Sequence, residues 1–586
     1  MLIRLSISFL DRNHLLIELT SGPNTLRIAP TGKKHMRLKH TDLSEDLKDS
    51  CSSPPLKEIR SRAPRSRLGR RLSSTALIAC ITCVLAADDI QRTQTTEIGR
   101  EVAIARHLSD GEEFSATVTN LLKYGAQIFS ANWTVQEGQG RPFLKGTGKS
   151  LSDPSSPLLF PRNMNRLSGP DANSCAGCHN VPFAGGAGDA ATNVFVLGQR
   201  FDSMTFDPSN SFVTGGTFDE RGVETNLLTF SNSRATPGLF GAGYYELLAR
   251  EITADLRAIA SSIDPGQSAP LLSKGISFGV LRRSGDGRWD VSAVGGLPPQ
   301  ATATSGDVRP TLVLQPWHQA GGVVSLRQFT NNAFLQHHGM EPEERVGRGI
   351  DLDGYGFVNE LTRADITAVT IFQAAIAVPG RVIPTDTAVR EAIATGEKLF
   401  ANIGCVRCHV PSLPLRNWIY TEPSPFNPQT NLQLGEVSVY AIDLTSPHLP
   451  GPRLRLDGDV INVPVYTDFK LHNLCDTPMD PNAELLDQNR LMGSAAFFEG
   501  NQLFLTKRLW DIGSKPNHFH HGKFTTIRES ILAHGGEARE NRKAFIMLGA
   551  DDQGAIIEFL KSLRVLPPGT KSLTVDENGD PVKWPR

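Results

Sequence analysis

A pattern of five residues, Cys-x-x-Cys-His, occurs twice in this chain and limits what the chain can fold around. The two copies are Cys175-Ala-Gly-Cys178-His179 and Cys405-Val-Arg-Cys408-His409. Two cysteines at this spacing can add to the two vinyl groups of one porphyrin, and the histidine that follows then ligates the iron. The pattern therefore predicts two covalently bound c-type haems, held by Cys175, Cys178, Cys405 and Cys408, with His179 and His409 as proximal iron ligands.

Two other chemistries use paired cysteines. A zinc ribbon places its cysteine pairs roughly 15 to 20 residues apart, whereas more than two hundred residues separate these pairs. A thioredoxin-type motif does not require a histidine directly after each pair. Zinc binding and thiol redox chemistry remain as alternatives that fit the pattern less well.

The composition indicates a globular protein with a large core. Of 586 residues, 39% are hydrophobic and 21% are charged, and 60 basic residues balance 61 acidic ones. A net charge this close to zero is not typical of a general nucleic-acid binder or of a protein that adheres to membrane surfaces. We therefore expect no nucleic-acid partner.

The first ninety residues differ from the rest. A basic run from Arg60 to Arg71 precedes an apolar stretch, Thr75 to Leu85, and a small-residue cleavage pattern ends at Ala86. These features predict a signal peptide at residues 65–86, with residues 1–64 as an extension that a misassigned start site would explain. The apolar stretch is too short to span a bilayer, so we expect a periplasmic mature chain without a transmembrane helix. An alternative is a lipid anchor at Cys80, because residues 77–80 resemble a lipoprotein box. Cys475 is the one cysteine of the predicted mature chain outside the two boxes, and we interpret it as a buried thiol.

Short repeats flank the two boxes. Gly125–Phe129 precedes the first box and Gly396–Phe400 precedes the second, and both fit a helix that leads into the box. Downstream of each box, apolar residues recur at helical spacing in Asp365–Ile376 and in Asp552–Leu563. The same order of features in both halves predicts two helical haem domains.

The segment between the first box and its closing helix is more varied. Ile276–Leu281 and Trp289–Val294 alternate apolar and polar residues around a Gly-Asp-Gly turn, which predicts a β-hairpin, while Tyr244–Ile263 has helical spacing. We therefore expect a mainly α fold with two cytochrome c-like haem domains. The first, at residues 96–385, carries a small β insertion, and the second spans residues 386–586.

Six strings in the mature chain stand out, at residues 168–180, 324–330, 337–340, 359–362, 519–522 and 533–538. They resemble the di-haem oxidoreductases, a family that is similar to thiol oxidoreductases and related to the bacterial di-haem cytochrome c peroxidases, over roughly Gly125 to Pro567. The resemblance implies two haems, hydrogen peroxide as the substrate, and a small c-type cytochrome or copper protein as the electron donor.

The resemblance also implies a second iron ligand. In the peroxidases a methionine, fourteen residues after the histidine of a Phe-His-Asp-Gly segment, is the sixth ligand of the C-terminal haem. The segment here is Phe519-His520-His521-Gly522, and the corresponding position is His534. Imidazole in place of thioether should lower the potential of that haem. A surface histidine near a helix end is the alternative for His534, and His521 replaces the aspartate without a predicted role.

No residue is fixed by spacing as the distal group of the first haem. His318, His337 and His338 are candidates, and each could instead be a hydrogen-bonded core histidine or a proton relay. Residues 183–190, after the first box, are rich in glycine, which would leave space for a small ligand; a flexible turn is the alternative. We predict that the haem of His179 binds the peroxide.

Residues 351–356 place two carboxylates, Asp351 and Asp353, and a turn glycine as a calcium loop does. The motif is incomplete, because Tyr355 and Thr362 stand where an EF-hand has acids. Di-haem peroxidases carry calcium between their domains, so the resemblance implies calcium at Asp351 and Asp353, with a plain Asp-Gly turn as the alternative.

These features predict an enzyme that reduces hydrogen peroxide, in which one haem passes electrons to the other. A non-catalytic di-haem electron carrier is an alternative. A haem enzyme that oxidises a protein side chain is another.

Overall fold

The computed structural model describes residues 4–11, 14–21, 24–28, 98–139, 172–189, 191–194, 232–351, 356–490 and 494–584. The chain divides into two compact units, Met1–Ala79 and Cys80–Arg586, and each is described by itself. In the first unit β1 (Arg4–Asp11), β2 (His14–Ser21) and β3 (Asn24–Ile28) form an antiparallel sheet in that order. The predicted signal peptide and Cys80 lie outside the described residues. None of the helices described is both long and apolar enough to cross a membrane.

Strands form a larger part of the chain than the sequence predicts. Of the described residues, 33% are helical and 16% are in strands, and these strands form seven small sheets, so the expectation of a mainly α fold is wrong. Many strands have only three or four residues, and β10 (Leu413–Leu415) pairs with the distant β13 (Ile461–Val463). An alternating pattern needs a longer run to be recognised, which is why periodicity missed these strands. The two haem domains, at 96–385 and 386–586, stay predictions.

The remaining elements of the second unit are short, with a few exceptions. The helices and helical turns not described below are η1 (Glu112–Phe114), η2 (Val135–Glu137), α5 (Pro299–Thr302), α6 (Leu326–Ala333), α7 (Glu343–Val346), α10 (Ala495–Phe498), η6 (Ile512–Ser514), α11 (Ile527–Leu532), η7 (Gly536–Ala538) and α12 (Arg539–Met547). The strands are β4 (Ala191–Val194), β5 (Asn232–Ala235), β9 (Gly380–Val382), β12 (Tyr440–Asp443), β14 (Leu471–Asn473), β15 (Leu503–Leu505), β16 (Leu563–Arg564) and β17 (Thr574–Val575).

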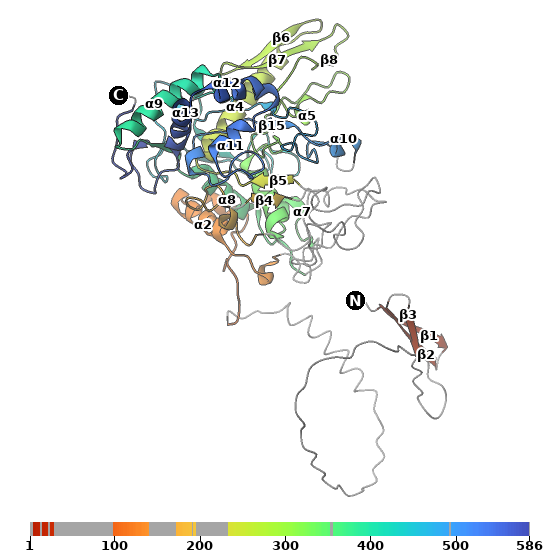
Figure 1. The fold of residues 1–586 in the computed structure, drawn as a ribbon. Coiled ribbons are helices and arrows are strands. Elements are labelled where there is room, and N and C mark those ends of the chain that lie inside the picture. The colour runs from red at the N-terminus through yellow and green to blue at the C-terminus, as the bar shows by residue number, and fades with distance from the viewer. Residues whose placement is uncertain are drawn as a thin grey trace, which may run out of the picture. The chain divides into compact units, whose positions relative to one another are not determined.

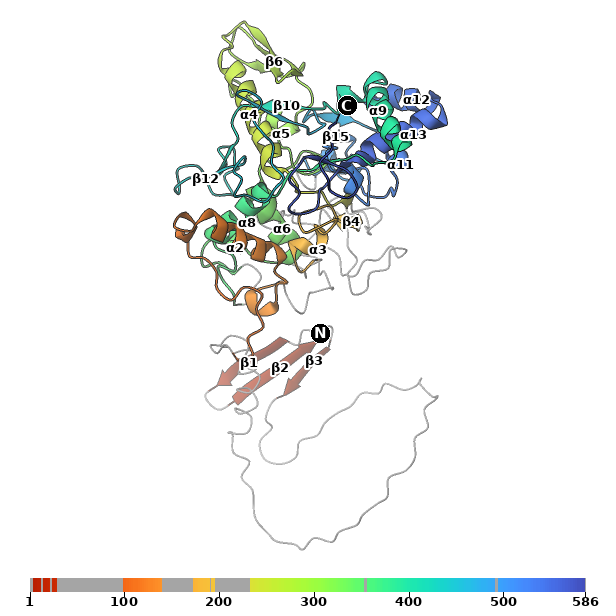
Figure 2. The ribbon, with the colours of Figure 1, turned by 90° about the vertical axis from the view of Figure 1, so that its left-hand side faces the viewer.

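The predicted repeats are confirmed as two helix pairs. Helix α2 (Val118–Ser130) packs against α8 (Arg363–Ala375), and α9 (Thr387–Asn402) packs against α13 (Ala550–Ser562), as Figures 1 and 2 show. Each pair crosses at a glycine. A Cβ on Gly125 would lie 2.2 Å from the carbonyl oxygen of Ala368, and one on Gly396 would lie 1.9 Å from that of Ala555. The repeat therefore encodes a close helix crossing beside each Cys-x-x-Cys-His box.

Replacing Gly396 by alanine should lower the free energy of unfolding by about 1 to 3 kcal/mol, because α9 and α13 must move apart to admit the methyl group. Gly554 is the matched control, since it lies in α13 and a Cβ there would meet no atom within 4 Å. Alanine at Gly554 should instead stabilise the helix by roughly 0.5 to 1 kcal/mol. Thermal melts of the two variants test this, and equal melting temperatures would refute the close crossing.

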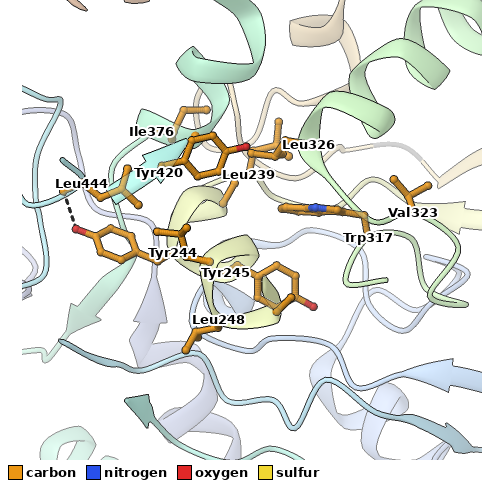
Figure 3. Close-up of a cluster of buried hydrophobic side chains, with 14 of the residues drawn as sticks. Leu239, Tyr244, Tyr245, Leu248, Trp317, Val323, Leu326, Ile376, Tyr420 and Leu444 are labelled. Atoms are coloured by element: carbon orange, nitrogen blue, oxygen red, sulfur yellow. Dashed lines mark hydrogen bonds between the residues drawn. The ribbon is translucent and has the colours of Figure 1, made fainter. Parts of the chain in front are cut away.

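One large apolar core joins segments from both predicted haem domains. It contains Tyr245 and Leu248 of α4 (Ala242–Ser261), Trp317, and Tyr420 of β11 (Ile419–Glu422), and Figure 3 shows these side chains together. Beside them the hydroxyl of Tyr244 donates to the carbonyl oxygen of Leu444 at 2.7 Å. The long helix predicted in this region is thus confirmed. The hairpin is confirmed as well, as the antiparallel sheet of β6 (Ser268–Ser273), β7 (Ile276–Arg283) and β8 (Trp289–Asp290).

Candidate functional site

Both Cys-x-x-Cys-His boxes fold as a single helical turn, which brings two thiols and an imidazole to one cavity. The first turn is α3 (Cys175–Cys178), and the hydroxyl of Ser174 caps it by accepting from the N–H of Gly177 at 3.0 Å. The second is η5 (Cys405–Arg407), directly after α9. In each box the histidine N–H donates to the carbonyl oxygen of the first cysteine, at 2.8 and 3.0 Å. None of these four cysteines forms a disulfide with another cysteine of the described residues.

The second cavity has a volume of about 160 Å³, and Cys405, Cys408, His409 and His534 are among its lining residues. The ring centroids of His409 and His534 are 6.4 Å apart. One metal ion between two imidazoles needs about 6 Å, because each metal–nitrogen bond is about 2 Å long and each nitrogen lies about 1 Å from its ring centroid. The two rings are therefore spaced to bind one iron between them.

A backbone carbonyl oxygen lies within hydrogen-bond distance of Nδ1 in both of these imidazoles, which leaves Nε2 as the nitrogen that could bind a metal. Nδ1 of His409 lies 3.1 Å from the carbonyl oxygen of Tyr466, and Nδ1 of His534 lies 2.7 Å from that of Ser530. A histidine that donates from Nδ1 keeps Nε2 available for a metal, as metal-binding histidines commonly do. Burial lowers the pKa of His409 to about 4, and it lowers the pKa of His534 as well. Both rings are neutral at neutral pH, which is the state that binds metal.

The first cavity is larger, about 390 Å³, and Cys175, Cys178 and His179 are in its wall. Nδ1 of His179 lies 3.2 Å from the carbonyl oxygen of Gly186, and burial lowers the pKa of His179 to about 4. Its ring packs against Phe129, with the ring centroids 6.0 Å apart, and His337 and His338 lie in the same cavity. The two cavities thus differ in size and in their histidines.

The glycines after the first box form a tight turn that positions His179. A Cβ on Gly186 would lie 1.9 Å from the carbonyl oxygen of Val181, and one on Gly188 would lie 2.7 Å from that of Cys178. Only glycine allows the backbone to approach itself this closely. These glycines support the histidine, and they do not account for the volume of the cavity.

All three histidines predicted as distal candidates line the first cavity. His338 lies against the box, with Nε2 3.4 Å from Sγ of Cys175 and Nδ1 2.8 Å from the carbonyl oxygen of Ala172. His337 precedes it in the helical turn η4 (Phe334–His338). His318 has a backbone φ of 64°, and such left-handed residues other than glycine cluster at functional sites. Burial, and next the charge of Arg234, lower the pKa of His318 to about 3.

A polar group forms one side of the first cavity. Nη1 of Arg234 lies 3.3 Å from Nδ1 of His318, and its Nη2 lies 3.3 Å from Oε1 of the buried Glu484. The same carboxylate oxygen accepts a hydrogen bond from the side-chain amide of Gln319. A cation, an amide and a neutral imidazole are therefore held together at the cavity wall. Sequence reasoning missed Arg234, Gln319 and Glu484, because the chain brings them together from three distant segments.

Two of the strings quoted for the resemblance have structural roles. Arg327, in the string 324–330, is fully buried and lies 2.6 Å from Glu344 and 3.5 Å from Glu422. The hydroxyl of Thr362, in the string 359–362, caps α8 by accepting from the N–H of Asp365. His521 lines neither cavity, and its Nε2 lies 3.1 Å from Oδ1 of Asn482.

Three further histidines line the second cavity, His472, His518 and His520. The ring of His520 stacks on Phe504 at 3.7 Å between centroids, and neither of its nitrogens has a hydrogen-bond partner in the described part of the chain. His472 lies between Asp468, at 2.8 Å, and Glu537, at 2.7 Å. Burial opposes its charge, but hydrogen bonds to Asp468 and Cys408 raise the pKa of His472 to about 11. The two unpartnered ring nitrogens of His520 fit a cavity that holds a polar prosthetic group.

The calcium prediction is not tested, because Asp353 lies outside the described residues. The carboxylate of Asp351 accepts from the N–H of Gly356 at 2.6 Å. A hydrogen bond from an aspartate to a nearby backbone N–H is typical of a turn. Calcium at Asp351 and Asp353 stays a prediction.

A family model described as "Di-haem oxidoreductase, putative peroxidase" matches residues 460–563. The resemblance to the di-haem oxidoreductases is confirmed. The matched segment contains His472, Lys507, Arg508, His520 and His534, all of which line the second cavity. The match supports haem as the cofactor of a redox enzyme.

No match was found among curated proteins. Among solved structures, hydrazine synthase of Kuenenia stuttgartiensis pressurised with xenon is 13% identical, with a TM-score of 0.22, and the match covers 54% of this chain and 92% of that chain. A TM-score this low does not establish a shared fold.

Proposed function

We propose that this chain is an exported di-haem c-type oxidoreductase that reduces hydrogen peroxide in the periplasm, with electrons from a small c-type cytochrome or copper protein. The observation that supports this proposal is the difference between the two cavities. The second contains two imidazoles, those of His409 and His534, spaced for one iron, whereas the first has a larger volume and a polar wall that contains Arg234 and His318. A carrier that only transfers electrons needs no such difference.

The residues of both cavities fit a haem. Cys175 and Cys178 would hold one haem by thioether bonds and Cys405 and Cys408 the other, with His179, His409 and His534 as iron ligands. When bound, a haem supplies a redox-active iron, and its axial ligands set the potential. The neutral state of the three imidazoles, and the carbonyl oxygens that hold their Nδ1 atoms, prepare them for this role.

The polar wall of the first cavity suits peroxide chemistry. Reduction of hydrogen peroxide to water consumes two electrons and two protons and places negative charge on oxygen. The guanidinium of Arg234 can stabilise that charge. The imidazole of His318 is neutral and can take a proton from the substrate, and Glu484 holds Arg234 in place beside it.

The experiment that tests the proposed function is a steady-state assay of the purified di-haem protein. We expect oxidation of a reduced small cytochrome or copper protein that depends on hydrogen peroxide and saturates with it. Protein with both haems intact that shows no such oxidation would leave the electron carrier as the better description. Oxidation of a protein side chain in the same assay would favour the alternative that the chain is a haem enzyme acting on a protein side chain.

Replacing His534 by methionine should raise the midpoint potential of the second haem by on the order of 100 mV, part of the ≈0.8 V range that axial ligands span. The reason is that thioether favours reduced iron more than imidazole does. The first haem serves as an internal control, and methionine at the exposed His448 serves as an external one. A potential that does not move would show that His534 is not a ligand. Redox titration followed by absorption spectroscopy measures both haems.

A further inference from the structure

The two cavities share a wall. Six residues line both of them, and this shared wall consists of Ala235, Thr236, Leu505, Lys507, Arg508 and Lys515. Backbone hydrogen bonds fix the segment that follows β15, with Thr506 N–H donating to the carbonyl oxygen of Lys470 at 3.0 Å and Leu509 N–H to that of Val465 at 3.3 Å. Lys507 and Arg508 therefore stand on a fixed segment between the cavities.

The cations of the shared wall differ in whether a carboxylate forms an ion pair with them. Nζ of Lys515 lies 2.7 Å from Oδ1 of Asp511. Arg508 is only 6% exposed, and its Nε and Nη2 have no hydrogen-bond partner in the described residues. Its guanidinium lies over the rings of Tyr245 and Trp317, at 4.7 and 5.5 Å from their centroids, and Figure 3 shows these two rings in the core. The aromatic rings fix the guanidinium but provide no negative charge.

A buried guanidinium is unfavourable unless an anion compensates its charge, and no carboxylate of the described residues is hydrogen-bonded to Nε or Nη2 of Arg508. Lys507 precedes Arg508 in the chain and lines the same two cavities, so a second cation stands beside the first. A bound anion would offset the charge of both. The planar guanidinium pairs best with a planar anion that accepts two hydrogen bonds, which is a carboxylate.

We infer that Lys507 and Arg508 form an anion site in the shared wall and bind propionate carboxylates of the two haems. This inference rests on the proposed function, which places a haem in each cavity. Every haem carries two propionates, and both cavities present the same two cations to their occupants. Because both haems would share this positive charge, one substitution should change the potential of both.

The test is a redox titration of the purified di-haem protein with Arg508 replaced by glutamine or by lysine. Loss of the charge in Arg508→Gln should lower the equilibrium constant for reduction of each haem about tenfold, which is about 59 mV for one electron. Arg508→Lys keeps the charge and should recover most of the shift. Arg564→Gln, which removes an exposed arginine of β16, is the matched control and should move neither potential.

Three results would overturn the inference. A shift confined to one haem would show that the site serves only one cavity, and the absence of a shift in either haem would show that no haem carboxylate is bound there. Wild-type potentials that change with phosphate concentration at constant ionic strength would indicate a free anion instead. The proposed function fails separately, since it requires two covalent haems and peroxide turnover in the wild type, which a haem assay and kinetics report.

Discussion

Replacing His179 by glycine is expected to lower peroxide turnover with a reduced cytochrome donor by on the order of 10³-fold or more, the scale at which single members of a catalytic unit act. The substitution removes the imidazole whose Nδ1 is held by Gly186 and which stands beside the larger cavity. Cys175 and Cys178 are unchanged, so the haem should stay attached. Steady-state kinetics at equal haem content measure the effect.

Glycine at the exposed His448 is the control for this experiment and should leave turnover unchanged. A His179→Gly protein with both haems and wild-type turnover would show that peroxide is not reduced in the first cavity. Loss of turnover together with an unchanged potential of the second haem would locate the effect at the first.

Alanine at both Cys175 and Cys178 should leave one covalent haem in place of two. Thioether bonds survive denaturation, whereas a haem held only by its axial ligand is extracted by acidic acetone. Cys475→Ala is the matched control, because Cys475 is a buried cysteine outside both boxes, and this variant should retain two haems. The haem content of the denatured proteins gives the number of covalently bound haems in each variant. Extraction of both haems from the wild type would remove the covalent assignment altogether.

The sequence predicted those parts of the site that depend on short spacing. The two boxes are local, so one helical turn is enough to bring their thiols and imidazole together. The position of His534 came from a family pattern, and the ring spacing of 6.4 Å to His409 agrees with it. The repeats that begin with Gly125 and Gly396 also correspond to structure, because each of these glycines allows two helices to cross closely.

The sequence could not predict what long-range packing assembles. Arg234, His318 and Glu484 meet at the first cavity although long stretches of chain separate them, and no local pattern marks them. The adjacent pair Lys507 and Arg508 is visible in the sequence, but only the fold shows that it lies between two cavities. The fold class was wrong for a related reason, since strands of three residues are stabilised by distant partners and not by their own pattern.

The central claim is that the two haem sites are unequal, with His409 and His534 closing the second and the first open to peroxide. Electron paramagnetic resonance and absorption spectra of the purified protein, recorded before and after reduction by one electron, test this claim most directly. We predict a low-spin signal from the second haem in the oxidised protein and a high-spin haem in the first site on half-reduction. Two low-spin haems in both states would contradict the claim and favour an electron carrier.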